Sequence, residues 1–419
     1  MVKQIFSIFF IILCIFACSK NNKQTETHIE QQQSEDELIY INLEDILQKE
    51  GSELLSSAAS EIHYIPLETN KQSVIRSISK VVIWEEKLLI GELFNLKLFD
   101  RTGKYIRHIS QTGSGPADFR HVNNILVNPS SNEFYIITQF KAIKFDSQAS
   151  FIKNIRLENV SDYVPAIYNT GIFTPDGTFL FYMINSDWVV GDTTTVYSLI
   201  KVDTLGTTLA YYENQFPRYY ESIKMPYRLS FRPLYVYDNH VRFIEFGHDT
   251  LYTIQHEQMI PYAVVDLGKM KTNHTPELPQ ISMIDPREIE DALANKPGLS
   301  LVNLYENNSF LFITLAKGFM SDIRYNTVYN KQTGELNLLK EEGLTNDLDG
   351  GIAFYPRKIE ANGDMIMWKS AEVFKEEILS KDYDAQKAKY GERFEKVYRL
   401  AESLQDDDNP IIIVAKGKK

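Results

Sequence analysis

The chain has 419 residues, of which 43% are hydrophobic and 24% are charged, and its formal net charge is −12. A chain of this length and apolar content can bury a large core without disulfide bonds. Phosphate binding needs a basic face, and no block of Lys and Arg offsets the acidic excess, so we expect no nucleic acid partner. The same charge argues against electrostatic adhesion to anionic lipids.

Residues 1–17 are expected to be a signal peptide. After one Lys, residues 5–17 form an apolar run of about 13 residues, which is too short to span a bilayer core of about 30 Å. The end of this run, Ile15-Phe16-Ala17-Cys18, resembles a bacterial lipobox in which Cys18 receives the lipid. The alternative is an ordinary signal peptide that happens to contain a cysteine.

The polar residues that follow predict a lipidated flexible tether over residues 18–37. Such a tether would anchor the protein to a membrane of the cell envelope, on the periplasmic side or at the surface. Cys14 and Cys18 are the two cysteines of the sequence, so cleavage would leave one acylated cysteine and no intrachain disulfide.

Three short elements are predicted after the tether. Residues 38–43 alternate weakly between apolar and polar side chains, residues 44–60 fit a short helix, and residues 61–68 are typical of a strand. Pro66 suits the edge or the end of that strand, because proline has no N–H to donate to a neighbouring strand.

Residues 97–158 contain the same unit twice. A short apolar run ends in Phe-Asp, first at Phe99-Asp100 and again at Phe145-Asp146, and a turn and a second apolar run follow. Such runs, bounded by Asp, Gly, Ser and Asn, are typical of antiparallel hairpins. A hairpin unit that recurs after about 46 residues has the period of a propeller blade.

Similar units continue along the chain and predict an all-β fold, a six-bladed β-propeller over residues 38–419. Runs such as 310–315 are apolar on both faces, as expected for strands buried between neighbouring blades. Strands at 61–67 and 411–414 are expected to share a blade and so to close the ring. The predicted blades cover residues 78–109, 122–157, 171–212, 234–267, 300–339 and a last unit that starts near 351 and includes 356–368.

Two helical interruptions are predicted. A short helix is expected between residues 285 and 297, and a longer insertion covers about residues 371–404, with a break near Tyr390-Gly391. We interpret the apolar positions of the longer insertion as a face packed against the propeller; the alternative is a docking element for a partner. Asp406-Asp407-Asp408 is interpreted as a solvated turn rather than a calcium site, because EF-hand spacing is absent.

Six phrases of the sequence resemble one family, the six-bladed β-propeller lipoproteins common in Bacteroides-type bacteria. They are YIPLET at 64–69, FDRTG at 99–103, GSGP at 113–116, HDTLYTI at 248–254, NDLDGG at 346–351 and DNPI at 408–411. One departure is Ala117-Asp118-Phe119, where such proteins more often show Gly-Glu-Tyr. The resemblance implies a TolB-like or NHL-like six-bladed ring, and it supplies no reaction and no catalytic residue.

The sequence contains no complete catalytic motif. Gly113-Ser114-Gly115-Pro116 lacks the Lys and the following helix of a phosphate-binding loop, so we interpret it as a connection between blades. The eight histidines show no close ligand spacing, although a metal held by separate blades stays open. His248-Asp249-Thr250 resembles part of a catalytic triad but lies in a hairpin pattern. We therefore assign no catalytic residue, no metal ligand and no cofactor.

Three loops carry the candidate ligand-binding residues. Each precedes a predicted blade at a comparable phase of the repeat, and equal phase predicts that all three lie on one face of the propeller. There their basic residues would make the channel mouth locally positive, which focuses an anionic ligand. The candidates are Asp118, Arg120 and His121 in the first loop, Arg228 and Arg232 in the second, and Asp347 and Asp349 in the third.

The expected function is non-enzymatic binding of a small molecule, a glycan or a protein through the channel face of a lipid-anchored propeller in the cell envelope. An alternative from another class is a metal-dependent lyase or hydrolase of the propeller superfold, which a tightly held stoichiometric cation would favour. A third interpretation is a structural scaffold of an envelope complex, with the helical insertion as its docking element.

Overall fold

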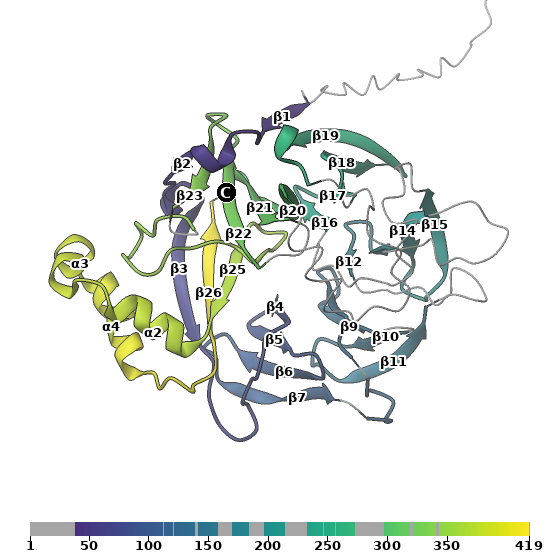
Figure 1. Cartoon of the computed structure of the whole chain (residues 1–419). Coiled ribbons are helices and arrows are strands. Elements are labelled where there is room, and N and C mark those ends of the chain that lie inside the picture. Colours follow the sequence, from purple (N-terminus) through teal and green to yellow (C-terminus); the bar gives the residue numbers. More distant parts are fainter. Residues whose placement is uncertain are drawn as a thin grey trace, which may run out of the picture. The chain divides into compact units, whose positions relative to one another are not determined.

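The computed structural model contains six β-sheets arranged in a ring, which confirms the predicted six-bladed propeller (Figure 1). In each sheet one end strand lies toward the centre of the ring, and successive strands lie farther out. The structure describes residues 38–111, 113–119, 121–138, 141–157, 170–183, 197–213, 233–245, 247–255, 257–272, 297–318, 322–340 and 343–418.

Blades 1, 2 and 3 are antiparallel meanders of consecutive strands. Their inner strands are apolar on both faces because each face packs on a neighbouring blade; Phe179–Tyr182 is buried throughout. Blade 1 contains β4 (Lys80–Trp84), β5 (Lys87–Gly91), β6 (Asn95–Asp100) and β7 (Tyr105–Gln111); blade 2 contains β8 (Asn124–Asn128), β9 (Glu133–Ile137), β10 (Lys141–Phe145) and β11 (Phe151–Arg156); blade 3 contains β12 (Thr170–Phe173), β13 (Phe179–Tyr182), β14 (Tyr197–Val202) and β15 (Thr208–Glu213).

Blades 4, 5 and 6 each combine later strands with a strand from the start of the described chain. Blade 4 contains β16 (Leu234–Tyr237), β17 (His240–Ile244), β18 (Thr250–Gln255), β19 (Gln258–Asp266) and β1 (Ile39–Asn42); blade 5 contains β20 (Leu299–Glu306), β21 (Phe310–Lys317), β22 (Arg324–Asn330), β23 (Leu336–Leu339) and β2 (Glu50–Gly51); blade 6 contains β24 (Lys358–Ile359), β25 (Met365–Lys369), β26 (Ile411–Gly417) and β3 (Ala59–Pro66).

Residues 38–58 form a strap that covers the outer edges of two blades. β1 pairs in parallel with β19 of blade 4, and β2 pairs in parallel with β23 of blade 5. The predicted helix over 44–60 is wrong: two short 3-10 helices, Ile46–Gln48 and Leu55–Ser57, flank β2 instead. Ile46 and Leu55 are fully buried, so pairing and packing against the blades override the local helical tendency.

The predicted closure of the ring is confirmed by β3 and β26. The two strands are antiparallel, with Ile412 opposite Ile65 and Val414 opposite His63. Ile411 and Ile413 pack toward blade 5, whereas Ile412 and Val414 pack toward blade 1. This explains why the last strand is apolar without alternation.

The Phe-Asp turns that define the repeat share one hydrogen-bond pattern. Asp100, Asp146 and Asp203 each accept from the backbone N–H groups two and four residues later through one carboxylate oxygen. The residue three positions after each Asp has positive φ, which in blade 1 is +87° at Gly103. A Cβ on Gly103 would lie 2.0 Å from the Pro66 carbonyl oxygen, so this turn also packs against the end of β3.

The helical insertion lies between β25 and β26 and confirms the prediction. It contains α2 (Ala371–Leu379), α3 (Tyr383–Tyr390) and α4 (Glu392–Ser403), and the break falls at Gly391, which has φ of +63°. Phe374 and Val397 join the core cluster that also contains Phe354 and Ile413, so α2 and α4 pack against the propeller. The helix expected between 285 and 297 lies outside the described residues except for its end.

We predict that Gly103→Ala lowers the free energy of unfolding more than Gly177→Ala does. Both glycines have φ near +86°, where an Ala costs about 1–2 kcal/mol. A Cβ on Gly177 meets no atom within 4 Å, whereas one on Gly103 meets the Pro66 carbonyl at 2.0 Å. Urea denaturation of both variants measures the difference, and equal losses would show that the close contact carries no energy.

Candidate functional site

The connections between strands divide into two faces. On the turn face they are short, such as residues 85–86 between β4 and β5 and 203–207 between β14 and β15. On the loop face lie the blade-to-blade connections and those between the second and third strands, including the helical insertion. Long connections on a rigid scaffold are the usual location of binding residues.

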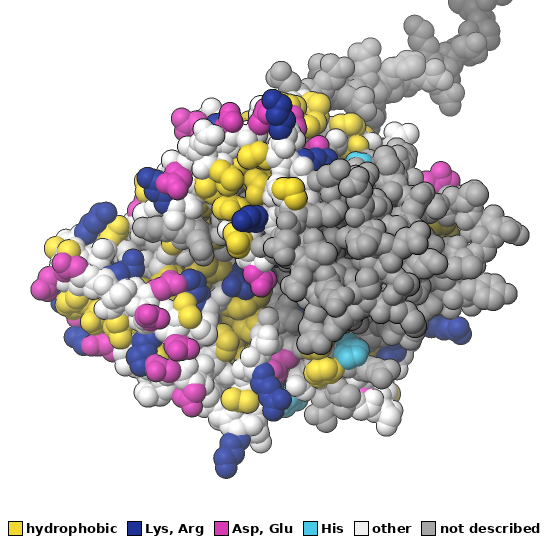
Figure 2. All heavy atoms as spheres, in the orientation of Figure 1, with side chains coloured by type: hydrophobic (Ala, Val, Ile, Leu, Met, Phe, Trp, Pro, Cys, Tyr) yellow, Lys and Arg dark blue, Asp and Glu magenta, His cyan; other side chains and the backbone are white. Residues whose placement is uncertain are grey.

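Among the connections between strands, exposed large hydrophobic side chains are more numerous on the loop face than on the turn face; the others lie mainly on outer strands and the strap. Val74, Leu93, Phe94 and Ile323 are each about half exposed in connections of that face. In the turns of the opposite face, the described residues include one large exposed hydrophobic side chain, Leu205. Figure 2 shows one side of the molecule, where hydrophobic side chains are exposed among charged ones. Leu93 and Phe94 are an adjacent exposed pair, and neighbouring exposed apolar side chains are more typical of an interaction site than single scattered ones.

The predicted loops at 118–121 and 347–349 share the loop face. Residues 112–123 connect β7 to β8 and residues 340–357 connect β23 to β24, so each joins the last strand of one blade to the first strand of the next. Equal phase therefore places both on one face, although at different blade junctions. Arg120, Arg228, Arg232 and Cys18 lie outside the described residues.

Asp118 shapes its own loop. Its Oδ2 accepts from the backbone N–H of Gly115 at 2.8 Å. A Cβ added to Gly113 would lie 2.2 Å from the same oxygen, so the Gly-Ser-Gly-Pro sequence fits around this carboxylate. The connection is followed by β8 rather than by a helix.

Next to this loop, His121 and Lys141 lie at the junction of blades 1 and 2. The His121 ring packs beside the Phe94 ring, with centroids 5.1 Å apart, and the buried His121 Nδ1 finds no hydrogen-bond partner in the described part of the chain. Lys141 begins β10, and its Nζ donates to the Asp118 backbone carbonyl at 3.2 Å. Burial lowers the pKa of the Lys141 ammonium, and the charge of Asp118 partly opposes this effect.

The carboxylates of Asp347 and Asp349 accept hydrogen bonds from other groups of the protein. Asp347 accepts from the backbone N–H and the hydroxyl of Ser56, which ties the strap to blade 6. Asp349 Oδ1 accepts from Tyr64 at 3.1 Å, Asn346 at 2.7 Å and the Gly351 N–H at 2.9 Å. Burial raises the pKa of Asp349, against these hydrogen bonds. Both carboxylates therefore hold the closure of the ring.

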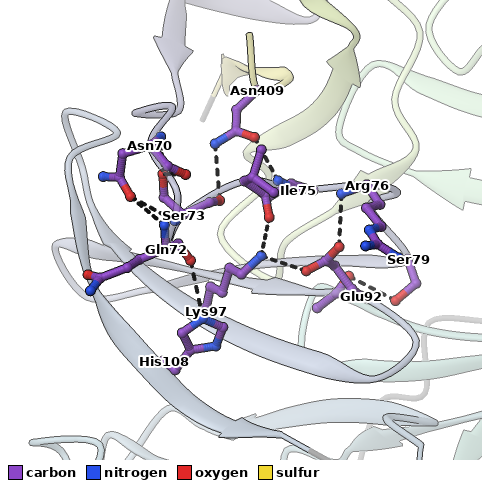
Figure 3. Close-up of polar contacts among 12 residues, drawn as sticks. Asn70, Gln72, Ser73, Ile75, Arg76, Ser79, Glu92, Lys97, His108 and Asn409 are labelled. Atoms are coloured by element: carbon purple, nitrogen blue, oxygen red, sulfur yellow. Dashed lines mark hydrogen bonds and ion pairs between the residues drawn. The ribbon is translucent and has the colours of Figure 1, made fainter. Parts of the chain in front are cut away.

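Figure 3 shows a second closure network, around the connection from β3 to β4. The buried Asn409 side chain accepts from the Ile75 N–H at 2.7 Å and donates to the carbonyls of Glu68 at 2.7 Å and Ser73 at 3.1 Å. Lys97 and Glu92 form a buried ion pair at 2.7 Å in the same region. The buried polar groups Asn409, Lys97 and Glu92 all have partners, so the network fixes a loop rather than awaits a ligand.

The fragment His248-Asp249 lies in the connection between β17 and β18 on the loop face. Asp249 pairs with Lys271, with 2.8 Å between carboxylate and ammonium. Burial and then the positive charge of Lys271 lower the pKa of His248 to about 4, so its ring is neutral at pH 7. The structure thus shows a carboxylate engaged by a lysine.

The acidic turn at residues 406–408 forms bonds within the chain. Asp406 pairs with Lys375, and Asp408 accepts from the Gln405 N–H, so two carboxylates of the acidic turn bond within the chain.

Among the residues that the structure describes, no group of three His, Cys, Asp or Glu side chains is arranged for a metal ion. No helix in the described part of the chain is long and apolar enough to cross a membrane.

Leu93, Phe94 and Lys141 were missed by the sequence analysis. The signal for the first two is an apolar pair within the short connection between β5 and β6, where the repeat predicts polar turn residues. No comparable feature of the sequence marks Lys141, because the sequence alone does not show which acidic side chains lie near a lysine in the folded protein.

The family model described as Domain of unknown function (DUF4934) matches residues 38–416. No curated protein matches the chain. A Bacteroides fragilis protein described provisionally as exported is 16% identical, with a TM-score of 0.64, covering 91% of this chain and 100% of that one. A protein of unknown function from Bacteroides caccae is 12% identical, with a TM-score of 0.36, covering 67% and 81%. An inactive virginiamycin B lyase from Staphylococcus aureus with quinupristin is 8% identical, with a TM-score of 0.34, covering 59% and 65%.

We predict that Asn409→Ala lowers the free energy of unfolding by about 2–4 kcal/mol, because it leaves one buried N–H and two carbonyls without their partner. The matched control is Asn154→Ala, which removes one hydrogen bond of an exposed side chain to the Pro116 carbonyl. Urea denaturation measures both. A loss for Asn409→Ala no larger than that of the control would contradict a role in closure.

Proposed function

The chain belongs to the family described as a domain of unknown function, DUF4934, and from this premise we propose that it is a non-enzymatic binding module of the cell envelope. It would be anchored to a membrane by lipid on Cys18. Its ligand, a small molecule, a glycan or a protein, would be held on the loop face.

The adjacent exposed apolar pair Leu93 and Phe94 on the loop face carries this proposal. Leu93 and Phe94 are 46% and 47% exposed although they adjoin a well-packed blade. Leaving apolar surface in water lowers stability by roughly 25 cal/mol per Å², so its retention in loops favours a binding role. The half-buried Lys141 adds a charged group to the same region.

The lipobox-like Ile15-Phe16-Ala17-Cys18 supports the envelope location. The similarly folded Bacteroides fragilis protein, described provisionally as exported, agrees with an exported chain. The fold begins at residue 38, which leaves the polar residues 19–37 between it and Cys18 as a connection to the membrane.

A thermal-shift screen of the full-length mature protein tests the binding role. The compounds are mono- and disaccharides and small organic acids, and a ligand at 100 times its dissociation constant adds about 2.7 kcal/mol of stability. We expect at least one compound to raise the melting temperature and to be recovered unchanged. A compound that is consumed would instead support a lyase or hydrolase, and a screen without any stabilising compound would contradict the proposal for these classes.

We predict that Cys18→Ala releases the protein from the membrane fraction into soluble fractions, because the variant cannot be lipidated at that position. The measurement is fractionation followed by immunoblotting, together with incorporation of an alkyne-labelled fatty acid. Cys14→Ala is the matched control, since Cys14 lies inside the predicted signal peptide, and it should leave labelling and fractionation unchanged. Persistent membrane association of unlabelled Cys18→Ala would contradict lipid anchoring.

A further inference from the structure

We propose that the loop face at the junction of blades 1 and 2 binds a small organic acid, a carboxylate joined to an apolar or aromatic group. This blade 1–2 corner consists of Leu93, Phe94, Asp118, His121 and Lys141. The inference rests on the proposed function and narrows the class of its ligand.

Lys141 supplies the positive charge of the corner. Its Nζ bonds the backbone carbonyl of Asp118, whose carboxylate is turned to the Gly115 N–H. No carboxylate of the described residues lies within ion-pair distance of this ammonium. By contrast, Lys144 on the same strand pairs with Glu133 at 2.7 Å. The charge of Asp118 offsets the desolvation of this ammonium only in part, so an incoming anion would stabilise it further.

Leu93 and Phe94 supply the apolar surface of the corner. They lie in the connection between β5 and β6, which is tied to the neighbouring loop by a hydrogen bond from the Val122 N–H to the Leu93 carbonyl at 3.0 Å. The same loop presents Lys141's partner Asp118 and the ring of His121, which packs beside Phe94. Apolar and cationic groups are therefore held at one junction by rigid strands.

His121 adds unused hydrogen-bond capacity. Its Nδ1 is buried and has no hydrogen-bond partner among the residues that the structure describes, which is unfavourable for a polar group. When Nδ1 carries the proton, its N–H can donate a hydrogen bond to a carboxylate oxygen. A ligand that repositions the ring would thus gain a bond that the protein alone does not make.

The charge of the corner selects the type of acid. Among the described residues of the corner, Lys141 is the one cation, and the Asp118 carboxylate accepts a hydrogen bond from the Gly115 N–H. The corner therefore matches a single carboxylate, whereas a chain of net charge −12 repels polyanions. The apolar part of the ligand would cover Phe94 and Leu93. The same chemistry is found in a free aromatic acid and at the C-terminus of a peptide that ends in Phe, so both are probes.

Isothermal titration of the full-length mature protein at pH 7 tests the inference. The probes are phenylacetate and the tripeptide Ala-Ala-Phe, with 2-phenylethanol and the C-terminal amide of the tripeptide as neutral counterparts. We expect saturable binding of at least one acid and at least about tenfold weaker binding of its neutral counterpart, because the carboxylate pairs with a partly buried ammonium. Tighter binding of the tripeptide would identify a peptide terminus as the source, and tighter phenylacetate a free acid.

Three variants assign the binding to this corner. Lys141→Met keeps the aliphatic stem and should weaken acid binding at least tenfold, Lys141→Arg should retain most of it, and Phe94→Ala should weaken it severalfold. Lys144→Met removes a lysine charge from the same strand and should leave the affinity unchanged. Melting temperatures verify that each variant is folded. If Lys141→Met is unstable, retained binding in Lys141→Arg together with weakened binding in Phe94→Ala still assigns the binding to this corner.

Two outcomes would overturn the inference. One is the absence of saturable binding of either acid up to about 10 mM, because a dissociation constant above this concentration is too weak to indicate a specific site. The other is acid binding that Lys141→Met and Phe94→Ala leave unchanged. In both cases a different compound that stabilises the protein in the thermal-shift screen would leave the proposed function standing, whereas failure of the whole screen would remove the inference and the small-molecule and glycan forms of the proposed function.

Discussion

The pairing of β3 with β26 is the constraint on which the rest of the structure depends. It joins residues near the two ends of the described chain, so the sixth blade forms only when the whole ring is in place. β26 is buried on both faces between blades 5 and 1, and it therefore links two core clusters. The strap then covers the outer edges of blades 4 and 5, which leaves fewer strand edges open to other chains.

Local physical chemistry explains which parts of this fold could be predicted from the sequence. The Phe-Asp turns are encoded locally, because the Asp bonds N–H groups only two and four residues away, and they recur at the blade period. The closing strand was predictable from its unbroken apolar run. The strap was not, because β1 and β2 pair with strands more than 200 residues later, and the short segments between them resemble a helix when only local propensity is considered.

The sequence predicts three candidate loops on one face, and the structure describes two of them, but the sequence does not show how their carboxylates are bonded. Phase along the repeat places a loop on one face of a propeller, and both described loops lie there. Charge and residue type do not show which carboxylates are already bonded, and Asp347 and Asp349 hold the strap and the sixth blade. The feature that distinguishes Lys141 is that none of the described carboxylates lies within ion-pair distance, and this is visible only when the neighbours are known in space.

Different blade junctions on the loop face have different roles. At the junctions on either side of blade 6, polar side chains close the ring: Asp347 and Asp349 on one side, and Asn409 with the Lys97–Glu92 pair on the other. A ligand that competed for those groups would weaken the closure on which every blade depends. At the junction of blades 1 and 2 the strands are consecutive in sequence and need no such closure, so a cation and apolar side chains there can serve binding without disturbing the closure of the ring. Ring closure thus restricts where a propeller of this construction can place a binding site.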